Sequence, residues 1–187
     1  MKKFIYVELK YKNGDIMVEL IKKMLVPVDG SKASEKAVEY ASWVASKTGA
    51  NVTIIHVLDV DKLQMNYEAM DRFLPDWKDK IKGTDDIKRY SPFFENQLSC
   101  MMDDPICKRG NNILKEMEKL AAKNGMKVKT MLKLGRVVDT IVQIADEENF
   151  DHIVVGKTGL TGIRRLVIGH VAEDVAKYAS VRVTVVP

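Results

Sequence analysis

Short apolar runs and helical stripes alternate along most of the chain. Residues 24–29 (MLVPVD) form an apolar run that ends in an acid and is followed by Gly30 and Ser31. From residue 32 to residue 47, apolar side chains recur every three or four positions, and residues 51–58 (NVTIIHVL) form a second, β-branched run. Such short runs are typical of strands buried on both faces, and the stripe is typical of a helix packed on a sheet. This segment therefore predicts a strand, a helix and a strand.

The same alternation continues in the second half of the chain. In residues 126–134, apolar residues alternate with lysines, which is the period of a strand with one solvent-facing side and suits a sheet edge. The remaining patterns predict helices over 111–123, 137–148 and 171–178 and strands over 150–155 and 181–186. Strands that alternate with helices predict an α/β fold, in which a doubly wound, open, parallel five-stranded sheet carries helices on both faces.

Two segments do not follow this alternation. In the N-terminal extension, residues 1–23, two apolar runs flank the turn-forming pair Asn13-Gly14, which predicts a β-hairpin; a helix over residues 16–23 is the alternative. The main domain then covers residues 24–187 and contains an insertion at about residues 59–109. Prolines interrupt any long helix in this insertion, so we expect short helices and a mobile loop there.

Composition narrows the class of protein. With 187 residues, of which 46% are hydrophobic, the chain is long enough for one core but short for two full domains. The net charge of +4 is small and mixed along the chain, so neither nucleic acid nor a membrane is expected as a partner. Without signal-like features at its start, and with Cys100 and Cys107 as its only cysteines, the chain is expected to be cytoplasmic. Free thiols are favoured over a redox pair.

Candidate chemistry concentrates after the predicted strand 150–155. The stretch 156–171 (GKTGLTGIRRLVIGHV) contains four glycines and three lysine or arginine residues, and no acid lies between His152 and Ala172. Glycines let the backbone approach phosphate oxygens, and a helix that begins after Gly169 adds partial positive charge at its amino end. Spacing alone does not separate phosphate binding from a solvated basic loop.

A resemblance to a known family adds a more specific signal. The segments MLVPVDGS, IIHVLD and DHIVVGKTGLTGIRRLVIGHV resemble the universal stress protein family, over about residues 24–58 and 108–187. The most specific element is the family's nucleotide loop, G-x-x-G, nine residues and then G, which Gly156, Gly159 and Gly169 match. The resemblance implies a sheet of strand order 3-2-1-4-5 that binds ATP, ADP or AMP, with or without Mg²⁺.

The resemblance also implies roles for individual residues. Asp29 would accept hydrogen bonds from the ribose hydroxyls, because an ionised carboxylate suits such donors and repels phosphate. The adenine pocket would be lined by residues at the ends of three predicted strands: Pro27, Val28, Val57 and Val155. The phosphates would lie against the glycine-rich loop and the helix that follows it, at Gly156, Thr158, Gly159, Gly169 and Val171.

His170 departs from the family's pattern. Nucleotide-binding members place a serine or threonine there, whose hydroxyl caps the helix and contacts the terminal phosphates, whereas this chain has an imidazole. An imidazole can donate to a phosphate, more readily when protonated, but it is bulkier and could instead fill the γ-phosphate position. A solvent-facing histidine at a helix start is the alternative, so the departure favours AMP or ADP over ATP only weakly.

Catalysis and metal binding find no support in the sequence. The triplet Gly-Lys-Thr at 156–158 mimics the end of a P-loop, but Asp151 stands where that motif needs a glycine. His56 and His152 lie within predicted strands and are expected to be structural, and the cysteine spacing matches no metal site. We therefore predict no catalytic residue and no metal ligand.

Together these patterns predict an adenine-nucleotide-binding stress-response or regulatory protein that acts on an unidentified protein partner. A homodimer through strand 181–186 is also expected, because this strand would be an unpaired edge in a monomer and the resemblance implies that it joins two protomers. Two alternatives stay open. One is the same fold with a degraded pocket that serves as an ATP-independent interaction module, and the other is a slow nucleotide hydrolase.

Overall fold

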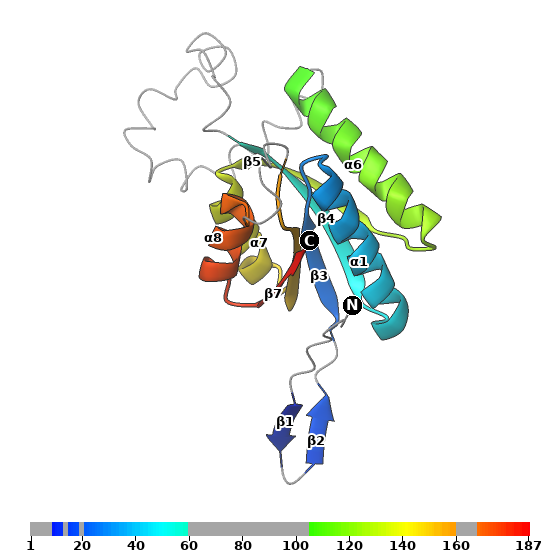
Figure 1. The fold of residues 1–187 in the computed structure, drawn as a ribbon, viewed down its shortest axis with the longest axis vertical. Helices are drawn as coiled ribbons and strands as arrows, with labels where there is room; N and C mark the ends of the chain where they lie inside the picture. The colour runs from blue at the N-terminus through cyan, green and yellow to red at the C-terminus, as the bar shows by residue number, and fades with distance from the viewer. Residues whose placement is uncertain (1–8, 13–14, 19–20, 60–104, 160–167) are drawn as a thin grey trace.

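The computed structural model describes residues 9–12, 15–18, 21–59, 105–159 and 168–187, and its main body is a sheet between two layers of helices (Figure 1). The sheet consists of β3 (Lys23–Pro27), β4 (Asn51–Asp59), β5 (Lys129–Gly135), β6 (His152–Gly156) and β7 (Arg182–Val186). Neighbouring strands all run parallel, in the order β5-β4-β3-β6-β7. The predicted α/β class and the strand order 3-2-1-4-5 are therefore confirmed, and the lysine-rich strand β5 is an edge strand.

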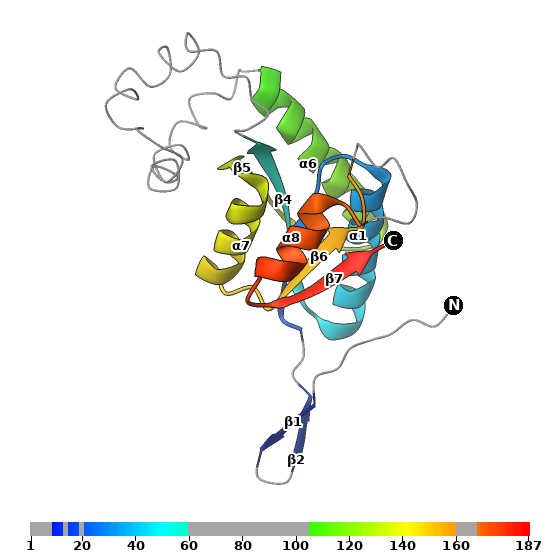
Figure 2. The same cartoon turned by 60° about the vertical axis from the view of Figure 1, so that its left-hand side comes forward.

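Within the described residues, four helices cover the two faces of the sheet. They are α1 (Lys32–Thr48), α6 (Pro105–Lys123), α7 (Val137–Glu147) and α8 (His170–Tyr178). Helices α1 and α6 lie on one face and α7 and α8 on the other, as the two views show (Figures 1 and 2). Val26 of β3 packs on the α1 side and Leu25 on the α7 side. Because successive residues of a strand point to opposite faces, burial on both sides explains the continuous apolar run.

Local sequence signals fix the ends of α1. The Ser31 hydroxyl accepts a hydrogen bond from the N–H of Ser34 at 3.2 Å, which caps the amino end of the helix. Gly49 ends the helix with a φ of 74°, and its N–H donates to the carbonyl of Ala45 at 2.8 Å. A left-handed φ favours glycine, so Gly49 ends the helix shortly after the apolar stripe of residues 32–47.

An antiparallel pair of strands precedes the sheet. Strands β1 (Leu9–Lys12) and β2 (Asp15–Val18) pair with Lys12 opposite Asp15, and Figure 1 draws them beyond the amino end of β3. The alternative helix over residues 16–23 is wrong, because residues 16–18 belong to β2, residues 21–22 are not helical and β3 begins at Lys23.

The bounds of α6 differ from the prediction. The helix begins at Pro105, six residues before the predicted start at residue 111, so residues 105–109 of the expected insertion are helical. Proline fits the first turn of a helix because the N–H that it lacks would have no partner there. Cys107 lies in this first turn and is buried. Asp59, the first residue of the expected insertion, ends β4, and residues 60–104, Cys100 included, lie outside the described residues.

None of the helices within the described ranges is long and apolar enough to cross a lipid bilayer.

Candidate functional site

Strands β3, β4 and β6 end at one edge of the sheet, and the segments singled out in the sequence follow these ends. Strands β3 and β6 are neighbours, yet β3 continues into α1 on one face while the chain after β6 reaches α8 on the other. Neighbouring crossovers that leave in opposite directions open a crevice at the carboxyl edge of a parallel sheet, which is the usual ligand position in such folds. The candidate site is therefore built around this crevice.

Asp29 lies in the turn between β3 and α1. Its Oδ1 accepts a hydrogen bond from the N–H of Ser31 at 2.9 Å, and Gly30 between them has a φ of 82°. The carboxylate also faces the glycine-rich loop, since a Cβ added to Gly159 would lie 2.7 Å from Asp29 Oδ2. The sequence-predicted sugar contact and one of the predicted phosphate contacts are thus neighbours in space.

Backbone hydrogen bonds hold the two described ends of the glycine-rich loop together. The N–H of Gly169 donates to the carbonyl of Lys157 at 2.8 Å, and the N–H of Lys157 donates to the carbonyl of Val186 at 2.7 Å. A Cβ added to Gly169 would lie 3.5 Å from the Cα of Thr158, so the chain segments approach closely here. Gly169 therefore uses its N–H within the stem of the loop. Arg164 and Arg165 lie outside the described residues.

The glycine at the end of β6 has a packing role. A Cβ added to Gly156 would lie 2.6 Å from the backbone carbonyl carbon and oxygen of Ala33, in the first turn of α1. Only a residue without a side chain permits this approach of strand and helix. Gly156 thus brings the glycine-rich loop beside the start of α1.

Helix α8 begins at this loop without a side-chain cap. Its N-cap residue is Gly169, which has no side chain that could accept a hydrogen bond from the N–H groups of the first turn. His170 is exposed and Val171 is half-buried at this helix start. Uncapped N–H groups and the helix dipole favour an anion at such a position.

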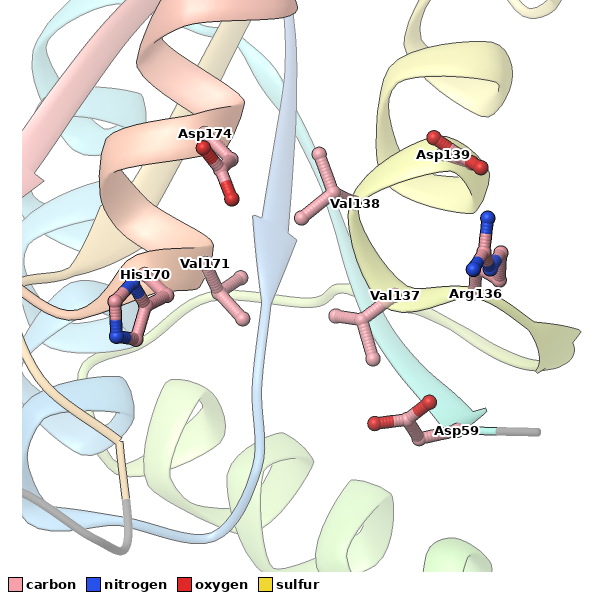
Figure 3. A pocket seen from close by; sticks show the side chains of 8 residues that line it. All are labelled: Asp59, Arg136, Val137, Val138, Asp139, His170, Val171 and Asp174. Atoms are coloured by element: carbon pink, nitrogen blue, oxygen red, sulfur yellow. The ribbon is translucent and has the colours of Figure 1, made fainter. Parts of the chain in front are cut away.

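A cavity of about 290 Å³ opens beside the start of α8 (Figure 3). Its lining comes from the end of β4 and the first turns of α7 and α8, namely Asp59, Arg136, Val137, Val138, Asp139, His170, Val171 and Asp174. The three valines lie at its centre in Figure 3, with polar side chains around them. The lining is thus apolar in the middle and carries three carboxylates, one arginine and one histidine at its rim. In the described ranges, no three acidic, histidine or cysteine side chains lie close enough to hold a metal ion.

Two of the predicted site residues, His170 and Val171, line this cavity. Val57 is buried beneath it, in the core cluster against which Val137, Val138 and Val171 pack. Val28 belongs instead to the core on the α1 side, so its side chain lies on the opposite face from the valines of the cavity. Of the other predicted residues, Pro27 and Val155 are buried, and Asp29 lies half-buried in the turn between β3 and α1. The rest belong to the end of β6 and the glycine-rich loop: Gly156, Thr158, Gly159 and Gly169.

Sequence reasoning missed the first turn of α7, residues 136–139, and Asp174 of α8. The signal for the former was present, because Gly135 and Arg136 separate a predicted strand from a predicted helix, which places that turn at the carboxyl edge as well. Asp174 carries no such signal, since one acid among the polar residues of a short helix is not distinctive.

The two histidines on the sheet are hydrogen-bonded. Nδ1 of His56 lies 2.7 Å from the carbonyl oxygen of Val28, and Nε2 of His152 lies 2.8 Å from Oγ1 of Thr184. Burial lowers the pKa of His152, an effect that Arg182 reinforces and Asp151 opposes. His152 stands at the amino end of β6, away from the cavity, which is consistent with a structural residue.

Comparisons with known proteins point to one family. A model of the universal stress protein family matches residues 20–187. Universal stress protein MJ0531 of Methanocaldococcus jannaschii is 31% identical over 198 residues, which cover 100% of this chain and 96% of that protein. Among solved structures, universal stress protein UspA from Lactobacillus plantarum has a TM-score of 0.65 at 22% identity, over 90% of this chain and 99% of that one. The universal stress protein from Archaeoglobus fulgidus in complex with dAMP has a TM-score of 0.58 at 18% identity, over 90% and 100%. At these identities the two structures show the shared fold.

Proposed function

The chain belongs to the universal stress protein family, and from this premise we propose that it binds an adenine nucleotide at the carboxyl edge of its sheet. The observation that carries the proposal is the cavity at His170 and Val171, because it adjoins the uncapped amino end of α8. An apolar cavity beside a ready anion site suits a ligand with a flat base at one end and phosphate at the other. The dAMP complex of the Archaeoglobus fulgidus protein supports this ligand class.

The cavity suits the base. Its volume of about 290 Å³ is at the lower end of the range for ligand pockets, which is enough for a base but small for a whole nucleotide. Val137, Val138 and Val171 offer apolar surface to the ring faces. Asp59 is a carboxylate on the same lining, and a carboxylate can accept a hydrogen bond from the amino group of adenine. This role of Asp59 distinguishes adenine from a base with a carbonyl at that position.

The sugar and the phosphates then lie outside the cavity. Asp29 accepts hydrogen bonds from the ribose hydroxyls, and its contact with Gly159 links the sugar position to the glycine-rich loop. The phosphate lies at the start of α8, where the N–H groups of Val171 and of the loop at Gly156, Thr158 and Gly159 donate. No metal is required to hold a monophosphate in this way, although ATP would enter with Mg²⁺.

His170 sets the preference among phosphate states. It stands where the resemblance to the family implies a serine or threonine, and it lines the cavity at the start of α8. Its ring donates to the α-phosphate while filling part of the space for further phosphates. We therefore propose affinities in the order AMP, ADP, ATP, with AMP the tightest.

Calorimetry on the full chain tests the proposal. Titrations with AMP, ADP and ATP should each give saturable heat for the wild type, and Asp29→Ala should weaken all three. Glu116→Ala, which removes an exposed carboxylate on α6, is the matched control and should bind as the wild type does. Absence of heat at millimolar AMP would contradict nucleotide binding and favour an ATP-independent interaction module, which the bulk of His170 also permits.

Two further parts of the proposal concern assembly and turnover. Strand β7 lies at the end of the sheet order, so we propose that two copies pair through it in the cytoplasm. Light scattering would then give twice the chain mass of 21.1 kDa.

The described site offers no base–nucleophile pair, so we propose binding without efficient hydrolysis. Phosphate release from ATP that His170→Ala or Asp29→Ala abolishes would instead indicate a slow hydrolase.

A further inference from the structure

The pairing of β3 with β4 ends in a side-chain hydrogen bond. The two strands pair from Lys23 opposite Asn51 to Pro27 opposite Ile55. One residue further on, the N–H of Val28 donates to the carbonyl of Ile55 at 2.8 Å. The carbonyl oxygen of Val28 is hydrogen-bonded to Nδ1 of His56 at 2.7 Å. A carbonyl can only accept, so Nδ1 carries the proton of this bond. Strand β4 thus holds both backbone polar groups of Val28.

Helix α6 keeps the His56 ring in place. A Cβ added to the buried Gly110 would lie 3.1 Å from Cδ2 of His56, so the helix backbone packs directly beside the imidazole. The same helix reaches the turn after β3, because a Cβ added to Gly30 would lie 3.4 Å from Ile113. The half-buried ring therefore lies between β4 and α6, with Nδ1 directed at the Val28 carbonyl.

The residue after Val28 is the proposed ribose contact. Asp29 is anchored on its other side by the hydrogen bond from the N–H of Ser31 to its Oδ1 at 2.9 Å. Between these anchors Gly30 has a φ of 82°, and as a glycine it has no side chain of its own to restrain the turn. The orientation of the Asp29 carboxylate therefore depends on both ends of the turn being fixed.

We propose that His56 is a positioning residue for nucleotide binding, whose Nδ1–H holds the Val28 carbonyl and thereby directs the Asp29 carboxylate toward the ribose. The inference rests on the proposed function, since it concerns the sugar end of the same site. His56 itself touches no ligand. Without its bond the turn from Val28 to Ser31 samples more conformations, and binding has to order it again.

Substitutions at position 56 separate the hydrogen bond from the bulk of the ring. His56→Asn keeps an N–H donor on Cγ, the same number of bonds from the backbone as Nδ1, whereas His56→Phe keeps a ring and removes the donor. We expect His56→Phe to weaken AMP binding by roughly three- to tenfold, the effect of one hydrogen bond, and His56→Asn to restore most of the affinity. A buried control is His152→Phe, which removes the hydrogen bond to Thr184 at the amino end of the sheet.

The readouts are calorimetric AMP affinity and urea unfolding on the same full-length samples. Both phenylalanine variants should lose stability, but only His56→Phe should lose affinity. Equal AMP affinity of His56→Phe and wild type would overturn the positioning role while leaving nucleotide binding intact. Equal weakening by His56→Asn and His56→Phe would also overturn it. Absence of AMP binding by the wild type would overturn the proposed function and this inference together.

A measurement on the wild type alone provides a second test. Nitrogen-15 NMR of the imidazoles distinguishes a protonated Nδ1 from a bare one. We expect His56 to be protonated at Nδ1 with or without AMP. A His56 ring protonated only at Nε2 would contradict the inference, because a bare Nδ1 cannot donate to the Val28 carbonyl.

Discussion

Replacing Gly156 with alanine tests how the glycine-rich loop joins the sheet. Gly156 is the last residue of β6, and a Cβ there would lie 2.6 Å from the carbonyl carbon and oxygen of Ala33 and 2.9 Å from its Cβ. The carbonyl atoms belong to the backbone of α1, so no change of rotamer can relieve the overlap. Helix α1 has to move away from β6 to admit the new methyl group.

The size of this effect follows from the overlap. Non-bonded carbon atoms prefer separations of about 3.5–4.0 Å, so the new contacts would be too short by roughly 1 Å. Overpacking of a core costs about 1–3 kcal/mol, and contacts with backbone favour the upper end of that range, about 3 kcal/mol. In a domain of this size each kcal/mol lowers the melting temperature by about 2–4 °C, so we expect a fall of roughly 6–12 °C.

Thermal and urea unfolding, followed by circular dichroism, measure the loss. Gly169→Ala is the matched control from the same loop, because its Cβ would have its nearest neighbour, the carbonyl oxygen of Lys157, at 3.3 Å. We expect the control to lose less than about 1 kcal/mol. A Gly156→Ala protein that melts together with the wild type would refute the close approach of β6 and α1, and with it the packing role of this glycine.

Three further predictions concern stability. Ser31→Ala should lower the free energy of unfolding by about 1 kcal/mol in urea titrations, since it removes the cap that accepts the Ser34 N–H. Asp151→Ala should lower the free energy of unfolding by about 1–3 kcal/mol in the same assay, because Asp151 Oδ2 accepts hydrogen bonds from two N–H groups at the start of β3, at 2.9 and 3.1 Å. A variant as stable as the wild type would contradict the contribution of these two bonds. Burial lowers the pKa of His152 below the ordinary value of about 6.5, so the fold favours the neutral ring. The stability that the neutral His152 ring contributes is fully present above its ordinary pKa and is lost as the pH falls toward the lower pKa of the folded protein. His152→Phe should therefore flatten the dependence of the unfolding free energy on pH between about 7 and 5. An unchanged slope would contradict this expectation.

The order and type of the elements could be predicted from the sequence because local patterns decide them. The β-branched run of residues 51–58 predicts a strand, and the structure has β4 there. The apolar stripe of residues 32–47 predicts a helix, and the structure has α1 there. Strand β5 could be recognised as an edge from its lysines alone. The strand order required more, since it came from the resemblance to a family.

The geometry of the site could not be predicted in the same way, because it depends on contacts between distant parts of the chain. The contact of Asp29 with Gly159 joins residues of two different loops, and no local pattern encodes it. The His56 bond to Val28 likewise depends on the register of β3 against β4 and on the closeness of Gly110. The start of α6 was missed for a local reason, since Pro105 was taken as an interruption although proline is favourable in a first turn.

The central claim is that an adenine nucleotide binds at the carboxyl edge of the sheet with its phosphate at the start of α8. The most direct test is a titration of the nitrogen-15-labelled full chain with AMP, followed through the backbone amide signals. The account predicts saturable shifts in three segments: residues 29–31, residues 156–159 and residues 169–171. No shift at millimolar AMP, or saturable shifts confined to residues outside these segments and the cavity lining, would contradict it.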